Sequence, residues 1–349
     1  MTDTRQIISH LHSFGRATRS EYGLLLTSTD TAAVDLLMTT ARRTAVERFG
    51  NEIYIRGLVE VTNCCRNDCY YCGIRRSNRS LERYRLTVEQ IVECCRRGHA
   101  MGFRTFVIQG GEGVVSADEV AEAVSLIVGE FPDSAVTLSL GEYDEPILRR
   151  WFEAGATRYL LRHETADRAH YERLHPSEMS FDHRRECLAT LKRIGYQTGA
   201  GMMIGSPYQT TESLIDDLEF LAELQPEMVG IGPFVPQSAT PFAGFAAGSV
   251  ELTLRVLAIV RLLLPDSNLP ATTALATLSE RGRERAILAG ANVVMPNLSP
   301  QTVRNKYTIY DNKKSFDLES AEGLAELEKQ LNSIGYHISD KRGDYQKRS

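Results

Sequence analysis

The 349-residue sequence lacks a long apolar run that is free of charge. Its longest apolar run, at residues 256–264, is interrupted by Arg261, whereas a membrane-spanning helix needs about 18–20 consecutive apolar residues. The first residues also lack a basic region followed by an apolar stretch, which a secretory signal would show. We therefore expect a cytoplasmic protein with no membrane partner.

A basic face is absent as well. The net charge is −5, and like charges do not cluster over more than a few residues. Proteins that bind nucleic acid usually carry a basic patch, so we expect no nucleic-acid partner. Hydrophobic residues make up 42% and charged residues 24% of the chain. These proportions are typical of folded globular proteins and exclude wholesale disorder.

The cysteines do not suit a disulfide framework, because their number, seven, is odd and four of them lie within residues 64–72. A cytoplasmic chain keeps its thiols reduced, and crowded thiols in a reducing compartment more often bind a metal. We interpret Cys64, Cys94, Cys95 and Cys187 as packing thiols, since cysteine is among the most often buried residue types.

Patterns of alternating strands and helices follow a helical N-terminal region. Ile7, Ile8, Leu11 and Phe14 recur at helical spacing, and Thr29 or Asp30 is predicted to cap a second helix at 32–46. Short β-branched runs predict strands at 57–62, 105–109, 135–140, 157–162, 199–204, 228–232, 271–274 and 291–295. Amphipathic patterns predict helices at 88–101, 117–128, 145–154, 181–194, 212–224, 252–264, 280–288 and 321–334.

Eight strands that alternate with helices over about 250 residues predict an α/β fold, a closed (β/α)₈ TIM-type barrel. An open doubly wound sheet remains an alternative only if two of the strands are wrong. We expect an N-terminal helical extension at 1–50, the barrel at 51–310 and a C-terminal extension with a helix at 311–349. Catalytic residues of such barrels lie in the loops after the strands, so polar residues in those loops are the candidates.

The loop after the first barrel strand carries the most specific signal. Cys65, Cys69 and Cys72 have the spacing C-x₃-C-x₂-C, which lets three thiolates converge on one [4Fe–4S] cluster and leaves one iron open. Two alternatives remain. Cys64, Cys69 and Cys72 also match the plant-type [2Fe–2S] spacing, which needs a distant fourth cysteine. Zinc sites usually pair two cysteine knuckles, of which this sequence has one.

With Tyr71 as the aromatic residue before the last cysteine, this motif resembles that of the radical S-adenosylmethionine (SAM) superfamily. The resemblance implies that Cys65, Cys69 and Cys72 hold a [4Fe–4S] cluster as catalytic ligands and that SAM chelates its open iron. It further implies that one-electron reduction cleaves SAM to methionine and a 5′-deoxyadenosyl radical, with Tyr71 beside the adenine.

Residues Gln109, Gly110, Gly111 and Glu112 end the second predicted strand. By themselves the two glycines predict only a tight turn. In the superfamily a Gly-Gly-Glu-like run at this place receives the SAM amino group. The resemblance therefore implies that these four residues bind SAM, together with Ser139 near the end of the third strand.

Charged residues end the fourth predicted strand. Arg162 and Glu164 are two apart, so both point to one side of an extended segment, and charges at the mouth of an apolar barrel are costly unless they pair or bind a ligand. A simple salt bridge is the alternative. In relatives an acid here contacts the ribose and an Arg the reacting centre, which implies a catalytic Arg162 and SAM contacts by Arg162, Glu164 and Arg184. His163 points the other way and is expected to be a packing histidine.

Longer segments, among them IRGLVEVTNCCRNDCYYCGIR, PATTALAT and GANVVMPNLSP, resemble the HydE family of [FeFe]-hydrogenase maturases from about residue 55 to 310. The resemblance implies a substrate that is an iron complex carrying CO, cyanide and cysteine. It implies HydG, which supplies this complex, and HydF, on which the di-iron subcluster is assembled, as partners. The substrate residues that it implies are Met228, Thr272, Thr273, Met295, Tyr307 and Tyr310. For Met228 and Met295, packing in the barrel core is an equal alternative.

Two other functions remain open. Biotin synthase and methylornithine synthase (PylB) share shorter pieces of the pattern, so a PylB-like mutase, or a HydE-like paralogue with another small-molecule substrate, is the first alternative. A non-catalytic iron–sulfur scaffold is the second, although a scaffold has no need for residues 110–112 or for Arg162 and Glu164. Some HydE proteins carry further C-terminal cysteines for a second cluster. No cysteine follows Cys187, so we expect one cluster only.

Overall fold

The computed structural model describes residues 3–347, and its main sheet contains six parallel strands that neighbour one another in chain order. All six agree with the predicted strands to within two residues at both ends. They are β2 (Gly57–Thr62), β3 (Thr105–Gly110), β4 (Ala135–Ser139), β5 (Arg158–Leu160), β6 (Gln197–Ile204) and β7 (Met228–Pro233).

Isolated parallel bridges close this sheet into a barrel. Met228 of β7 pairs with Asn268, Pro270 pairs with Val293 of β8 (Val293–Val294), and Asn297 returns to Leu58 of β2. The seventh and eighth positions of the barrel are thus filled by residues 268–270 and by β8. The predicted (β/α)₈ barrel is confirmed, and the open doubly wound alternative is wrong.

The strand predicted at 271–274 is misplaced. The bridges lie earlier, at Asn268 and Pro270, and helix α11 (Thr273–Leu278) already begins within the predicted strand. Pro270 has no N–H to donate to a strand ladder, which limits pairing at this position to single bridges. Ala271 still donates its N–H to the Val293 carbonyl, whereas Thr272 caps the helix and the residues from Thr273 onward belong to it.

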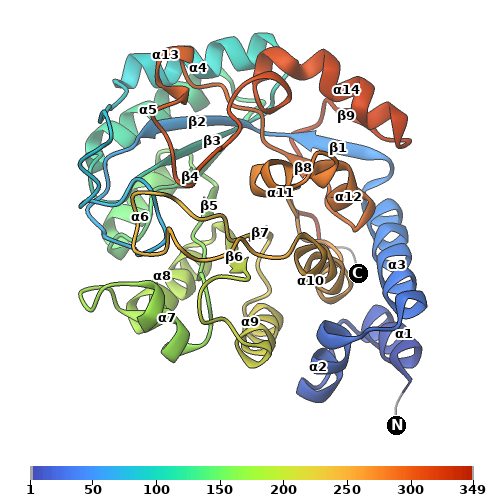
Figure 1. Cartoon of the computed structure of the whole chain (residues 1–349). Coiled ribbons are helices and arrows are strands. Elements are labelled where there is room, and N and C mark those ends of the chain that lie inside the picture. Colours follow the sequence, from blue (N-terminus) through green and yellow to red (C-terminus); the bar gives the residue numbers. More distant parts are fainter. Residues whose placement is uncertain (1–2, 348–349) are drawn as a thin grey trace.

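Helices surround the barrel (Figure 1). Predicted helices are present as α4 (Val88–Ala100), α5 (Ala117–Glu130), α6 (Glu145–Glu153), α8 (Phe181–Ile194), α9 (Thr211–Leu224), α10 (Val250–Leu263) and α12 (Gly282–Leu288). Thr87, Ser116 and Thr210 begin three of them with capping boxes. The short helices α7 (Arg168–Leu174), α11 and α13 (Gln301–Arg304) were not predicted, because they are shorter than the window in which helical periodicity is recognised. No helix within residues 3–347 is long and apolar enough to cross a membrane.

The N-terminal helices lie beside the barrel next to α10 (Figure 1). They are α1 (Thr4–Phe14), α2 (Arg19–Thr27) and α3 (Thr31–Phe49). Asp30 caps α3, as one of the two predicted alternatives, whereas α2 was not predicted. Ile7 and Leu11 join a buried cluster formed with α9 and α10, so this region packs on the barrel through an apolar contact.

The C-terminal segment covers the lower end of the barrel, where the strands begin. A small sheet in the order β8-β1-β9 joins β1 (Glu52–Ile55) and β9 (His337–Ser339), preceded by η2 (Ala321–Gly323) and α14 (Leu324–Ser333). Beyond β9, Asp344 accepts a hydrogen bond of 2.5 Å from the fully buried Arg158, and the Arg342 carbonyl accepts one of 2.8 Å from Thr105. The opposite end, where the strands finish, is left for the site.

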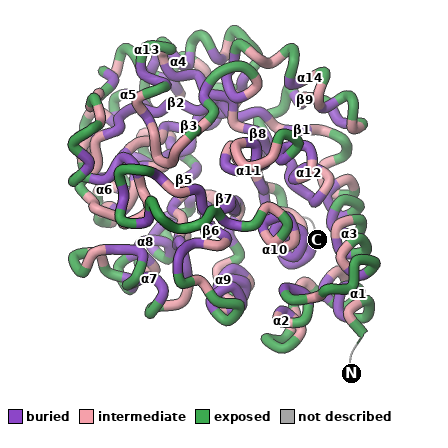
Figure 2. Tube along the Cα trace, in the orientation of Figure 1, coloured by how far each residue is buried: buried purple, intermediate pink, exposed green. Residues whose placement is uncertain are grey.

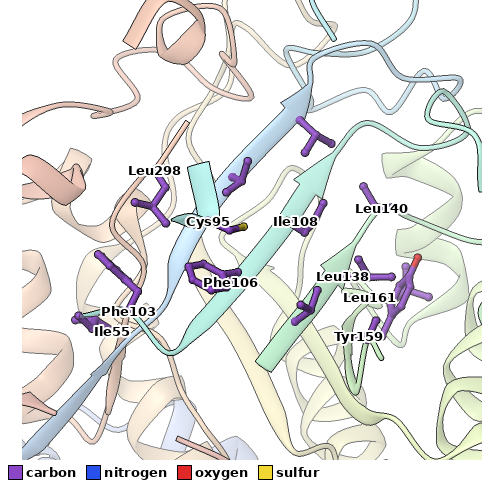
Figure 3. Close-up of a cluster of buried hydrophobic side chains, with 14 of the residues drawn as sticks. Ile55, Cys95, Phe103, Phe106, Ile108, Leu138, Leu140, Tyr159, Leu161 and Leu298 are labelled. Carbon is purple, nitrogen blue, oxygen red and sulfur yellow. The ribbon is translucent and has the colours of Figure 1, made fainter. Parts of the chain in front are cut away.

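Alternation along the strands decides which residues face the site. In β3, Phe106 and Ile108 face outward and pack with Cys95 of α4 and with Phe103 (Figure 3). Their neighbour Gln109 faces the barrel interior. In the central strands of the barrel, buried positions therefore run along both faces, and exposed positions lie in the helices and loops around them (Figure 2).

Candidate active site

The carboxyl ends of the strands open onto a cavity of about 340 Å³. Every predicted site residue except Met228 contributes to its lining. These residues are Cys65, Cys69, Tyr71, Cys72, Gln109, Gly110, Gly111, Glu112, Ser139, Arg162, Glu164, Arg184, Thr272, Thr273, Met295, Tyr307 and Tyr310. The barrel thus brings together side chains that are separated by more than 200 residues in the sequence.

The cysteine loop, residues 63–86, has no helix or strand, and polar side chains hold its shape. Asn63 donates to the carbonyls of Glu82 and Lys306 and accepts from the Tyr84 N–H. Arg83 donates to four carbonyls of the loop, including those of Asn63 and Ile74. Buried backbone groups need such partners, so these side chains fix the loop in place of regular secondary structure.

The three thiols of the motif face the same cavity. Burial raises the pKa of Cys65, Cys69 and Cys72, and for the last two the neighbouring thiols of the motif add to the rise. The Cys65 sulfur accepts hydrogen bonds from the N–H groups of Asn67 and Glu112, at 3.4 and 3.3 Å. Bound iron would offset the cost of three buried thiolates, and N–H donors to the sulfurs are a recognised feature of iron–sulfur sites.

These sulfurs are not arranged for a single ion. Within residues 3–347 no group of three or more His, Cys, Asp or Glu side chains is placed to hold a metal ion. The thiolates of one zinc ion each lie about 2.3 Å from it, whereas an iron–sulfur cluster distributes its thiolates over separate irons. The donor set of three thiols around one cavity therefore fits a cluster better than zinc.

The other cysteines of the plant-type alternative do not reach this cavity. Cys94 and Cys95 are buried in α4, Cys187 is buried in α8, and none of the three lines the cavity. Burial raises the pKa of Cys94 and of Cys187 to about 11. Both features fit the predicted packing role, and they leave the plant-type spacing without its fourth ligand.

Gly111, directly after β3, lets the backbone approach the cysteine loop. A Cβ atom on Gly111 would lie 1.9 Å from the Cys64 oxygen and 2.8 Å from the Cys65 Cβ. Only glycine fits at this distance. The next residue, Glu112, is held by two hydrogen bonds from Arg66, and its carbonyl accepts from the Arg66 N–H. The Gly-Gly-Glu run is thereby joined directly to the loop that carries the thiols.

Arg162 and Glu164 both point into the cavity from the segment after β5. The Arg162 Nη2 atom lies 3.1 Å from the Glu164 Oε2 atom, so the salt bridge expected as the alternative is present. Yet these two atoms and the Arg162 Nε are buried without a hydrogen bond of proper geometry. Buried charged groups left in this way carry an energetic penalty, which a ligand with hydroxyl and carboxylate groups would relieve.

Arg184 lies in the first turn of α8, and its Nε atom is 2.5 Å from the Glu142 Oε1 atom. It also donates to the Arg162 carbonyl at 3.3 Å. Burial raises the pKa of Glu142, against the effect of Arg184. Arg184 therefore joins the loops after β4 and β5 at the edge of the cavity.

Tyr71 is oriented by a buried histidine. The His175 Nδ1 atom lies 2.9 Å from the Tyr171 carbonyl, which only accepts, so Nδ1 donates and Nε2 accepts from the Tyr71 hydroxyl at 3.1 Å. Burial, followed by the nearby Arg184 charge, lowers the pKa of His175 to about 3. The imidazole is thus neutral near pH 7, as this hydrogen-bond pattern requires.

The deeper part of the cavity is polar and partly unsatisfied. Gln109 donates to the Tyr307 hydroxyl at 3.4 Å, and Thr273 donates to Glu319 at 2.9 Å. The Thr272 hydroxyl is buried without a hydrogen-bond partner. Met228 lies lower, beside a separate cavity of about 30 Å³, where its sulfur contacts Arg56. Met228 is therefore further from the thiols than the other predicted substrate residues.

Two charged residues of the cavity wall were missed by the sequence reasoning. Glu60 of β2 is fully buried, and its Oε1 atom lies 2.8 Å from the Lys313 Nζ atom. Asn297 donates to the other oxygen of Glu60, and the ammonium lies 5.5 Å from the centre of the Tyr307 ring. Glu60 is two residues after Leu58 in β2, so both side chains face the barrel interior, and this spacing could have identified Glu60 from the sequence. No local sequence pattern identifies Lys313.

Known proteins resemble this chain over most of its length. The family model described as the radical SAM superfamily matches residues 59–221. The [FeFe] hydrogenase maturase subunit HydE of Thermotoga maritima is 49% identical over 266 residues, which cover 76% of this chain and 75% of that protein. The 3-methylornithine synthase of Methanosarcina barkeri is 29% identical and covers 84% of this chain and 83% of its own length. A crystal structure of methylornithine synthase (PylB) superposes with a TM-score of 0.84 and 25% identity over 95% of this chain and 97% of its own.

Proposed function

This chain belongs to the radical SAM superfamily, and from that premise we propose that it is an [FeFe]-hydrogenase maturase of the HydE type. It is a radical SAM enzyme, whose cofactors are a [4Fe–4S] cluster and SAM. The observation that carries the finer proposal is the 49% identity to a HydE subunit over 76% of the chain.

Cys65, Cys69 and Cys72 would hold the cluster, with the N–H groups of Asn67 and Glu112 donating to the Cys65 sulfur. When bound, the cluster supplies the electron that cleaves SAM reductively. The protein's contribution is to bury the thiols, to place the Gly110–Gly111 backbone against their loop, and to leave one face of the site open to the cavity.

We assign the SAM contacts to groups that the structure leaves available. Glu164 and Arg162 carry buried polar atoms that lack hydrogen bonds, and they suit the ribose hydroxyls and the carboxylate of SAM. Glu112 and the Gly-Gly backbone suit its amino group, and Tyr71 suits its adenine. Arg184 and Ser139 complete the wall of the cavity.

The substrate that we propose is an iron complex carrying CO, cyanide and cysteine, which binds below SAM. Gln109, Thr272 and Tyr307 offer hydroxyl and amide groups to such a ligand, and two paired cations, Arg162 and Lys313, line the same cavity. Met295, Thr273 and Tyr310 line the same region. HydG as supplier and HydF as acceptor are proposed as partners in the cytoplasm.

The second candidate is a methylornithine synthase, favoured by the similarity of the whole fold to PylB. Methylornithine carries a cationic amine, which needs a free carboxylate for recognition. Of the three carboxylates that line the described cavity, Glu112 and Glu164 are assigned to SAM, and Glu60 is already paired with Lys313. This charge pattern favours the maturase.

The test is in vitro maturation of an apo-hydrogenase that is supplied with HydF, HydG and SAM under anaerobic conditions. Addition of this protein should restore hydrogen evolution, and its Cys69→Ser variant should not. A parallel assay follows methylornithine formation by mass spectrometry. Failure of maturation by a protein that still cleaves SAM would reject the maturase, and methylornithine formation would establish the second candidate.

A further inference from the structure

Glu164 has an unusual backbone conformation. Its φ angle is 66°, in the left-handed region that residues other than glycine rarely adopt, and yet it is buried and lines the cavity. Such conformations concentrate at functional sites and persist only where the surrounding structure enforces them. The contacts around Glu164 therefore show what keeps its carboxylate in place.

A buried histidine reaches the backbone that pairs with Glu164. The His163 side chain is 1% exposed and points away from the cavity. Its Nδ1 atom accepts a hydrogen bond of 3.2 Å from the Gly201 N–H, and the Gly201 carbonyl accepts one of 3.0 Å from the Glu164 N–H. Gly201 of β6 is thus hydrogen-bonded to His163 and to Glu164, two successive residues of the segment after β5.

Asp217 completes the arrangement from helix α9. Because Nδ1 of His163 is an acceptor, the ring proton lies on Nε2, which is 3.3 Å from the Asp217 Oδ1 atom. This is an ion-pair distance without hydrogen-bond geometry, since Nε2 is buried without a hydrogen-bond partner. The same carboxylate oxygen accepts the Ala166 N–H at 2.5 Å. Asp217 is fully buried, and it contacts the imidazole before Glu164 in the chain and bonds the backbone N–H of Ala166 after it.

The predicted packing role of His163 describes only part of this environment. Its ring does pack edge-on against Phe220, with centroids 4.9 Å apart. Packing alone would be served by an apolar side chain and would not require a buried carboxylate behind the ring. A buried acid is expensive unless all its oxygens are hydrogen-bonded. Asp217 accepts the Ala166 N–H, but its Oδ2 atom and the His163 Nε2 atom have no hydrogen-bond partner, a cost that packing does not explain.

We propose that His163 and Asp217 are positioning residues for SAM, which hold Glu164 in its left-handed conformation so that its carboxylate faces the ribose. The inference rests on the proposed role of Glu164 as a SAM contact. Neither His163 nor Asp217 touches SAM in this scheme. Their effect on binding passes through Glu164 alone, and this makes the proposal testable by combining substitutions.

The experiment measures SAM affinity by equilibrium dialysis of labelled SAM against the anaerobically reconstituted holoenzyme. Glu164→Ala should weaken binding at least tenfold. His163→Phe keeps a ring over Phe220 but removes both nitrogens, and it should weaken binding by about tenfold, as substitutions of supporting hydrogen-bond partners often do. His163→Asn, whose side-chain oxygen can accept from Gly201, should recover part of the loss.

His170 supplies the matched control. It is a buried histidine, 2% exposed, with hydrogen bonds to the Pro207 carbonyl and to Ser206, and it does not line the cavity. His170→Phe should leave SAM affinity within twofold of the parent protein, even if it lowers thermal stability as much as His163→Phe does. The difference between these two variants separates positioning from general destabilisation.

The double variant His163→Phe/Glu164→Ala gives the decisive comparison. It should bind SAM about as weakly as Glu164→Ala alone, because the positioned carboxylate is already gone. A full multiplication of the two losses, or equal affinity of His163→Phe and His170→Phe, would overturn the inference. Unchanged affinity of Glu164→Ala would instead reject the proposed SAM site. Should His163→Phe fail to fold, Asp217→Asn takes its place, and no loss of affinity in that variant would also overturn the inference.

Discussion

Gly111 is the position at which a single methyl group should do most damage to the site. An added Cβ would lie 1.9 Å from the Cys64 oxygen, whereas ordinary contact begins at 3.4 Å. The carbonyl of Cys64, or the Gly110–Gly111 backbone, must therefore move by about 1.5 Å in the Gly111→Ala variant. Both are main-chain atoms and cannot rotate away as a flexible side chain would.

The magnitude follows from this displacement. Forcing an extra methyl group into a packed site costs about 1–3 kcal/mol, which a protein of this size tolerates. A shift of about 1 Å at a reacting centre can lower the rate about 100-fold. We expect a folded Gly111→Ala variant that retains less iron and forms 5′-deoxyadenosine about 100 times more slowly.

The assay measures iron and sulfide per chain after anaerobic reconstitution, then 5′-deoxyadenosine by chromatography, with circular dichroism to confirm folding. Gly129→Ala is the matched control, because its Cβ meets nothing within 4 Å and Gly129 lies within helix α5. That control should keep full activity and gain up to about 1 kcal/mol of stability. Full iron content and unchanged SAM cleavage in Gly111→Ala would refute the close approach between the glycine run and the cysteine loop.

Further substitutions test three other parts of the account. Cys69→Ser should abolish iron binding and SAM cleavage with the fold intact. Cys64→Ser should retain about four irons per chain by elemental analysis, since the cluster uses three other thiols. Equal losses of iron in both variants would favour the plant-type spacing. Lys313→Met leaves the fully buried Glu60 without its cation and should destabilise the protein by about 3–5 kcal/mol in urea titrations. The double variant Glu60→Gln/Lys313→Met should recover much of this stability. No recovery would contradict the pairing of Glu60 with Lys313. Hydrogen bonds from Arg304 lower the pKa of Glu322 to about 2, so the stability that this carboxylate contributes is present above its usual pKa and is lost as the pH falls from about 5 towards 2. Glu322→Gln should therefore show a shallower fall in melting temperature over that range, and an unchanged slope would count against the ion pair.

The sequence predicted the barrel well because its signals are local and repeated. The strand β2 and the helix α8 were predicted with their observed bounds, since β-branched runs, capping residues and terminal glycines mark such elements directly. The misplaced seventh strand shows the limit of this approach. Around Pro270 the chain makes single bridges, and the apolar residues that follow belong to a short helix.

In the cavity, too, some residues could be predicted from the sequence and others could not. The thiol motif, the Gly-Gly-Glu run and the inward Arg162 and Glu164 lie at strand ends, where the fold dictates their convergence. Lys313 lies beyond the last strand, and only tertiary packing brings it to Glu60. Met228 lies too deep in the barrel to line the main cavity, and the spacing of residues in the sequence does not show this depth. The His163–Asp217 contact joins the turn after β5 to a helix more than 50 residues away.

The most direct test of the central claim is electron paramagnetic resonance of the anaerobically reconstituted protein after reduction with dithionite, with and without SAM. The account predicts a [4Fe–4S]⁺ signal that changes when SAM is added, because three cysteine ligands leave one iron open to it. A [2Fe–2S] signal that is indifferent to SAM, or a protein that binds no iron, would contradict the account.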